Sequence, residues 1–174
     1  MDDLNRKTTE EFKNASKLPV ILVLDNVRSM NNVGSVFRTA DAFLVEAIYL
    51  CGVTAQPPHR EIQKTALGAT ETVNWKHFES TLEAVNALKA EGYKIYAVEQ
   101  ADKSIMLNKF TPASGNIALV FGNEVTGVEQ AVIDVCDACI EIPQFGTKHS
   151  LNISVSAGIV IWEVAKAISN KPVL

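Results

Sequence analysis

Cysteine is scarce in this chain, which limits the chemistry it can carry. Three cysteines cannot all pair, and two of them form a single C-x-x-C at Cys136 and Cys139. No second cysteine pair or histidine pair completes a zinc site, so we expect no metal. Small buried thiols on or beside a strand are the simpler interpretation, and they fit the reducing environment of the cytoplasm.

Long apolar runs are absent as well. The most apolar stretch, Leu151 to Ala165, is short and carries Ser154, Ser156 and Glu163. A membrane helix needs about 20 predominantly apolar residues, so this stretch is not expected to span a membrane. The chain does not open on a basic and apolar leader, so secretion is not expected either. Ordinary composition, with 47% apolar and 21% charged residues and no repeat or linker, indicates a globular domain.

Basic residues are not in excess, although nucleic-acid-binding proteins usually present a basic face. The chain has 16 Lys and Arg against 20 Asp and Glu, which gives a net charge of −4. The imbalance is uneven: residues 1–64 carry eight basic and eight acidic side chains, and residues 65–174 carry eight and twelve. A local basic patch is compatible with these numbers, but composition does not locate it.

Strand-like and helix-like segments alternate through most of the chain. Strand patterns occupy residues 20–26, 46–52, 72–78, 93–99, 117–121 and 138–142. Helix patterns occupy residues 32–43, 60–67, 81–91, 128–136 and 150–168, and residues 100–116 form a polar connection. This alternation predicts an α/β fold with a mostly parallel sheet flanked by helices, in one domain over residues 19–174. Residues 1–18 form a polar arm, either a frayed helix or a mobile segment, which is solvated or in contact with RNA.

The helix near residue 32 carries several polar groups. Asn31 or Asn32 is a suitable N-cap, because its side chain can accept a hydrogen bond from a free backbone N–H. Gly34 lets another part of the chain or a ligand approach the first turn. Arg38 lies three residues before Asp41 on this helix, so one interpretation is that the two side chains form a surface ion pair.

Two polar loops follow the apolar runs at residues 117–121 and 138–142. In an open parallel sheet, ligands bind beyond the carboxyl ends of the strands, so these loops are the expected site. The helix that follows, residues 150–168, is apolar on most sides and is therefore expected to be buried all round. It lies either centrally in the fold or against a second subunit.

Three motifs in this order match one family. They are NNVGSVFRTADAF (N-x-G-x-x-x-R), LVFGNEVTGV (G-x-E-x-x-G), and IPQFGTKHSLNISVSAGI (I-P, then S-L-N-x-S). Together they span about residues 20–168, and the chain resembles the SpoU, or TrmH-like, branch of the SPOUT methyltransferases. The resemblance implies a C-terminal deep trefoil knot, S-adenosylmethionine as cofactor, and methylation of an RNA ribose 2′-hydroxyl. It also implies a homodimer with the site near the subunit interface, and tRNA ahead of rRNA as target.

The same resemblance assigns catalytic roles to Asn32, Arg38, Glu124, Ser150 and Asn152. Arg38 acts on the ribose hydroxyl, either as its base or by holding phosphate and stabilising oxyanion charge. The second role suits a guanidinium that stays protonated in proteins. Asn32 orients Arg38 or the RNA backbone, and Glu124 anchors the loops around them. Ser150 and Asn152 supply short polar groups at the start of the last helix.

The cofactor is expected to rest on backbone rather than on charged side chains, at Val98, Gly122, Ile142 and Leu151. Plain core burial is the alternative for Val98, and a simple turn is the alternative for Gly122. Gln144 departs from the apolar residue that many family members carry and is expected to tune the adenine side of the pocket. The chain also departs in its short ends, since family members that grip a whole tRNA tend to have longer basic extensions.

Two other classes of function compete with the enzyme. A non-catalytic RNA-binding module would keep the fold without the chemistry, but the catalytic positions named above are all occupied by the family's residue types. A dinucleotide-dependent oxidoreductase needs G-x-G-x-x-G after the first strand, and the chain reads DNVRSMNNVG there.

Overall fold

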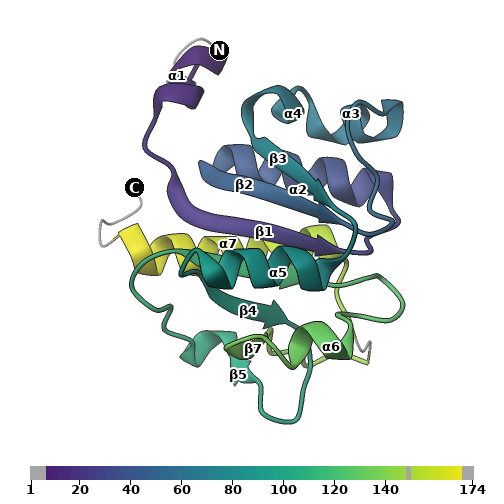
Figure 1. Ribbon diagram of the computed structural model, residues 1–174, viewed down its shortest axis with the longest axis vertical. Coiled ribbons are helices and arrows are strands. Elements are labelled where there is room, and N and C mark those ends of the chain that lie inside the picture. The colour runs from purple at the N-terminus through teal and green to yellow at the C-terminus, as the bar shows by residue number, and fades with distance from the viewer. Residues whose placement is uncertain (1–6, 148–149, 170–174) are drawn as a thin grey trace.

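The computed structural model describes residues 7–147 and 150–169 and shows an α/β fold built on one sheet (Figure 1). The sheet has seven strands in the order β3-β2-β1-β6-β4-β7-β5, and every pairing is parallel. The strands are β1 (Leu18–Asp25), β2 (Val45–Cys51), β3 (Asn74–Phe78), β4 (Lys94–Val98), β5 (Ile105–Met106), β6 (Ile117–Phe121) and β7 (Ala138–Glu141). The helices are α1 (Thr9–Asn14), α2 (Met30–Ala42), α3 (Arg60–Ala66), α4 (Ala69–Thr72), α5 (Thr81–Ala90), α6 (Gln130–Ile133) and α7 (Ile153–Ser169), with a 3-10 turn at Leu107–Lys109. The predicted fold class is confirmed.

Helices cover both faces of the sheet because its central strands are apolar on both faces. Successive side chains of a strand point to opposite sides. Leu22 of β1 therefore belongs to the core formed with α2 and α7, and its neighbour Val23 belongs to the core formed with α5 and α6. In Figure 1, α5 and α6 lie in front of the sheet and α2 and α7 behind it.

Helix α2 begins earlier than the sequence suggested. Its N-cap is Ser29, whose hydroxyl accepts a hydrogen bond from the Asn32 backbone N–H at 3.3 Å. The prediction of Asn31 or Asn32 as the cap is wrong, because both lie inside the first turn. The Asn32 side chain is thereby free to make contacts outside the helix.

Helix α3 lies directly on the first turns of α2, and Gly34 makes this possible. A Cβ atom on Gly34 would lie 2.1 Å from the Thr65 Oγ1 and 2.3 Å from the carbonyl oxygen of Ile62. The Thr65 hydroxyl also donates to the carbonyl of Asn31 at 2.9 Å. Of the two interpretations of Gly34, the structure supports the approach of another part of the chain.

We expect Gly34→Ala to lower the free energy of unfolding by about 1–3 kcal/mol, because forcing a methyl group into a filled contact strains both helices. Urea unfolding followed by circular dichroism measures this change. Gly146→Ala in the loop after β7 is the matched control, since a Cβ there meets no atom of the described chain within 4 Å. It should leave the free energy of unfolding within about 0.5 kcal/mol of wild type. Equal unfolding free energies for Gly34→Ala and wild type would contradict the expectation.

Helix α7 is not buried all round within one chain. One side packs into the core through Ile153, Ala157, Val160, Ile161 and Val164. The opposite side exposes Val155, Ile159 and Trp162, which recur at helical spacing. The central position considered from the sequence is therefore wrong, and the helix presents an apolar face to its surroundings.

Four smaller segments also differ from expectation. The polar arm is not fully solvated in its described part, because α1 buries Phe12 to 4% exposure in the main core; residues 1–6 lie outside the described residues. The connection 100–116 contains the short edge strand β5. Helices α6 and α7 begin at Gln130 and Ile153, two and three residues later than predicted.

The cysteines lie on or beside strands as the sequence suggested, although Cys136 is half-buried rather than buried. Cys139 is buried within β7, and Cys136 lies just before that strand. Burial raises the pKa of the Cys51 and Cys136 thiols to about 12, so both are protonated at neutral pH. Within the described residues, no helix combines the length and the apolar character that a membrane crossing requires.

Candidate active site

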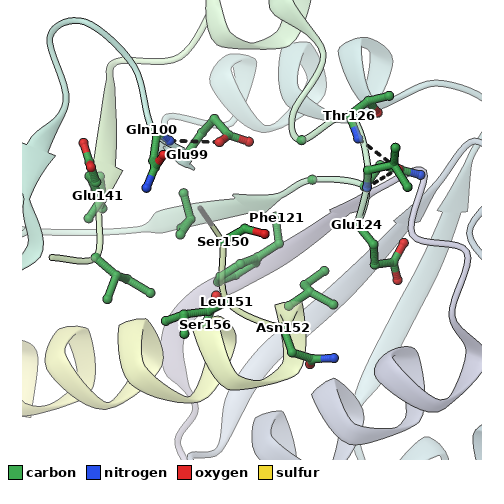
Figure 2. Close-up of a pocket in the computed structure, with 18 of the residues that line it drawn as sticks. Glu99, Gln100, Phe121, Glu124, Thr126, Glu141, Ser150, Leu151, Asn152 and Ser156 are labelled. Carbon is green, nitrogen blue, oxygen red and sulfur yellow. Dashed lines mark hydrogen bonds between the residues drawn. The ribbon is translucent and has the colours of Figure 1, made fainter. Parts of the chain in front are cut away.

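A cavity of about 490 Å³ opens at the carboxyl ends of β4, β6 and β7 (Figure 2). The loop after β6 forms one wall, and the segment that leads into α7 forms the opposite wall. The cavity thus lies between the two polar loops that the sequence marked as the expected site. Parallel strands bring their carboxyl ends to the same edge of a sheet, which is why loops far apart in sequence meet here.

The four residues predicted to bind a cofactor all line this cavity. Val98 lies at the end of β4, Gly122 follows β6, Ile142 follows β7, and Leu151 precedes α7. Ser150 and Asn152 line the same wall as Leu151. Gln144, the departure from the family pattern, is also a lining residue.

The loop after β6 folds tightly back on itself at Gly122. A Cβ on Gly122 would lie 2.1 Å from the carbonyl carbon of Gly127 and 2.2 Å from the backbone nitrogen of Val128. Asn123 and Gly127 exchange two backbone hydrogen bonds of 3.0 Å each, and Gly127 adopts a positive φ of 70°. Gly122 is therefore more than a turn residue, because the closure of the loop requires the space that its missing side chain leaves.

A chain of hydrogen bonds ties this loop to α2 and to the entrance of α7. The Glu124 carboxylate accepts from the Asn32 side-chain amide at 3.1 Å and from the backbone N–H groups of Arg28 and Ser29 at 3.2 Å. The Asn152 amide donates to the Asn32 side-chain oxygen at 3.1 Å. Asn32, Glu124 and Asn152 therefore meet in one hydrogen-bonded chain, and their catalytic roles stay predictions.

The same contacts set the ionisation of Glu124. Partial burial raises the pKa of its carboxyl group, but the hydrogen bonds that it accepts outweigh burial and leave the pKa below its ordinary value. The carboxylate is thus fully ionised at neutral pH. An ionised acceptor holds backbone donors more strongly than a neutral one, so Glu124 anchors the start of α2 to the loop after β6.

Arg38, like Asn32, does not line the cavity of its own chain. It is exposed on α2, six residues after Asn32. The alternative interpretation, a surface ion pair with Asp41, is wrong: within residues 7–147 and 150–169, Arg38 forms no ion pair. Asp41 instead accepts a hydrogen bond from the Thr72 hydroxyl.

Among the polar residues of the cavity wall that sequence reasoning missed, three lie at strand ends. Glu99 and Gln100 follow β4, and Glu141 ends β7. Their position directly at strand ends is the signal that would have found them, because the same rule located the other loops. Glu141 accepts a hydrogen bond of 2.5 Å from the Ser104 hydroxyl, and the contacts of Glu99 are described below.

Fold and cavity together define a parallel α/β protein with a ligand site where three strands end. Residues 19–162 match the model of one protein family, the SpoU rRNA Methylase family. The chain belongs to this family, as its motifs suggested.

Individual relatives agree with this assignment. The chain is 33% identical to the 23S rRNA (guanosine-2′-O-)-methyltransferase RlmB of Neisseria meningitidis over 155 residues. This aligned region covers 89% of this chain and 61% of that protein. The A. aeolicus TrmH/SpoU tRNA modifying enzyme superposes with a TM-score of 0.80 at 25% identity, covering 91% of this chain and 79% of that one. An AdoMet-bound rRNA methyltransferase from Sinorhizobium meliloti gives a TM-score of 0.80 at 27% identity, with coverage of 89% and 59%.

The chain spans 61–65% of the length of the curated relatives it matches first. The family model, over residues 19–162, includes every residue that lines the cavity of this chain. The trefoil knot expected from the resemblance stays a prediction.

Proposed function

We propose that this chain is an S-adenosylmethionine-dependent methyltransferase that modifies a ribose 2′-hydroxyl in RNA. The observation that carries the proposal is the meeting of Val98, Gly122, Ile142 and Leu151 in one cavity of a chain from this family. The names of its relatives support it, since they include RNA methyltransferases and one structure with AdoMet bound.

The cavity suits this cofactor in size and lining. Its volume of about 490 Å³ falls in the range of small-molecule sites. Apolar side chains such as Val98, Phe121 and Ile142 suit the adenine ring, and the backbone of the tight loop at Gly122 supplies polar groups. When bound, S-adenosylmethionine supplies a methyl group activated by its sulfonium.

The residues around the cavity then provide alignment and charge. Methyl transfer depends on in-line geometry, which a rigid rim favours. Glu124, Asn32 and Asn152 make that rim rigid, and Ser150 offers a short polar group beside it. The proposed task of Arg38 is to hold RNA phosphate and to stabilise the developing oxyanion.

The proposed partner is RNA, with tRNA as the first candidate and rRNA as the second. Relatives are named for both targets, which supports the substrate class more than either member. We also propose a cytoplasmic location, where such RNA is found. The test is transfer of tritiated methyl groups from labelled cofactor to bulk tRNA and to ribosomal RNA, together with calorimetry of cofactor binding. Absence of cofactor binding would overturn the proposal in favour of a non-catalytic RNA-binding module.

We further propose a homodimer formed through the exposed face of α7. Val155, Ile159 and Trp162 give this face its apolar character, and Trp162 also packs edge-on against Phe43 with ring centroids 6.1 Å apart. Covering such a face removes apolar surface from water, which favours association. Helix α2, which carries Arg38, lies in the same layer as α7, so a partner docked here would bring the two sites together.

We expect Val155→Lys to convert a dimer into a monomer, because an unpaired ammonium in an apolar interface is strongly unfavourable. Light scattering after size-exclusion chromatography measures the mass. Val53→Lys is the matched control, since Val53 is an exposed valine (65%, against 49% for Val155) on the loop after β2. A monomeric wild type, or a Val155→Lys protein that stays dimeric, would contradict this interface.

A further inference from the structure

Glu99 is a carboxylate on the cavity wall that none of the family motifs described above contains. It follows β4 directly and extends toward the loop after β6 (Figure 2). Its Oε2 accepts a hydrogen bond from the backbone N–H of Val128 at 3.0 Å, and its Oε1 accepts one from the backbone N–H of Gln100 at 2.9 Å. The side chain is therefore fixed at both oxygens.

The loop leaves room for this carboxylate by having glycine at position 127. A Cβ on Gly127 would lie 2.2 Å from the Glu99 Oε2, and Gly127 adopts a positive φ of 70°. Glycine at position 127 thus lets the loop backbone and the carboxylate approach more closely than a residue with a side chain would. Within the described residues, no Lys, Arg or His forms an ion pair with Glu99, so its charge is not neutralised by a cation of the chain.

The geometry points to Glu99 as a cofactor-binding residue that accepts hydrogen bonds from the two neighbouring hydroxyls of the cofactor's ribose. An ionised carboxylate has about four lone-pair sites, two on each oxygen. One backbone N–H occupies one site on each oxygen, which leaves one free site on each. Two adjacent acceptors match two adjacent hydroxyl donors, and carboxylates read ribose hydroxyls in the same manner at dinucleotide sites.

This inference rests on the proposed function and refines it. The sequence suggested that the cofactor rests on backbone rather than on charged side chains; Glu99 adds one charged contact to that set. The same carboxylate holds Val128, so it also positions the loop that carries Gly122 and Glu124. A positioning role and a direct ligand contact make different predictions. Only a direct contact makes the effect of replacing Glu99 depend on whether the ligand carries ribose hydroxyls.

The test is calorimetry of wild type and Glu99→Gln with three ligands: S-adenosylmethionine, 5′-methylthioadenosine, and the 2′,3′-dideoxy counterpart of the latter. We expect the substitution to weaken the first two about 10- to 100-fold, as for loss of hydrogen bonds to a charged group. The dideoxy ligand should bind the two proteins about equally, since it lacks the hydroxyls that the carboxylate reads. Glu79→Gln, which removes a carboxylate whose side chain is 94% exposed, is the control and should bind all three ligands as wild type does.

Each other outcome has one meaning. Equal weakening of all three ligands would assign Glu99 a positioning role alone and overturn the ribose contact. Weakening of S-adenosylmethionine alone would place the carboxylate at the amino-acid end of the cofactor and overturn it as well. If Glu99→Gln fails to fold, Glu99→Asp withdraws the carboxylate by one methylene and should give the same selective loss. A wild type that does not bind S-adenosylmethionine would instead overturn the proposed function.

Discussion

Gly122→Ala is expected to weaken the affinity for the cofactor by about 100-fold or more. The added methyl group would lie 2.1 Å from the Gly127 carbonyl carbon and 2.2 Å from the Val128 nitrogen. Both are backbone atoms, so no side-chain rotation relieves the overlap and the loop itself must move. A displacement of about 1 Å at a functional site can reduce its performance roughly 100-fold.

Calorimetry with S-adenosylmethionine measures this loss, and urea unfolding measures the accompanying strain of about 1–3 kcal/mol. Gly146→Ala is the matched control, because Gly146 lies in the loop after β7 and a Cβ there meets no atom of the described chain within 4 Å. It should bind cofactor as wild type does. Unchanged cofactor affinity in Gly122→Ala would show that the loop is not part of the cofactor site.

Arg38→Ala is expected to lower methyl transfer about 100- to 1000-fold while leaving cofactor affinity unchanged. Removing one group that stabilises transition-state charge typically has an effect of this size. Arg38 is exposed and lies outside the cavity of its own chain, so cofactor binding does not depend on it. The measurement is tritium incorporation into RNA, beside calorimetry of cofactor binding.

Lys94→Ala controls for the loss of a positive charge. Lys94 begins β4, at the end of the strand opposite to the cavity, and pairs with Asp137 at 3.0 Å. Arg38→Lys should recover only part of the activity, because a lysine cannot reproduce the planar fork of donors. Equal incorporation by Arg38→Ala and wild type would remove Arg38 from the mechanism.

The activity of mixed dimers shows whether Arg38 acts at the cavity of its own subunit or at that of the partner subunit. In a dimer of one Arg38→Ala subunit and one Gly122→Ala subunit, the first has an intact cavity and the second has an intact arginine. Activity restored on mixing would place Arg38 in the site of the partner subunit. No restoration would place it in its own.

Much of the fold was predictable because its signals are local. The apolar runs of β1 and β6, the Ser80 cap of α5 and the Gly92 that follows it are short patterns that depend on neighbouring residues. Ser80 stands three residues before Glu83, which is a common N-cap spacing, and its hydroxyl accepts from the Glu83 N–H at 3.2 Å. Such patterns hold in any protein that buries a parallel sheet between helices.

The errors come from contacts between distant parts of the chain. By residue type, the cap could be any of Ser29, Asn31 and Asn32. The choice among them depends on the tertiary contacts of the Asn32 side chain. Its side chain bonds to Glu124, which is 92 residues away, so Ser29 caps the helix. Gly34 was open to a ligand or a chain segment, and the approach of α3 decided it.

The sequence by itself determined the parallel α/β class, the family, and the two loops at the strand ends, because apolar periodicity and ordered motifs are properties of the linear chain. Tertiary structure alone decided that four predicted cofactor residues share one cavity, that Glu99 lies on its wall, and that Arg38 lies outside it. The physical reason is that strand order brings β4, β6 and β7 to one edge, and no local pattern encodes that order.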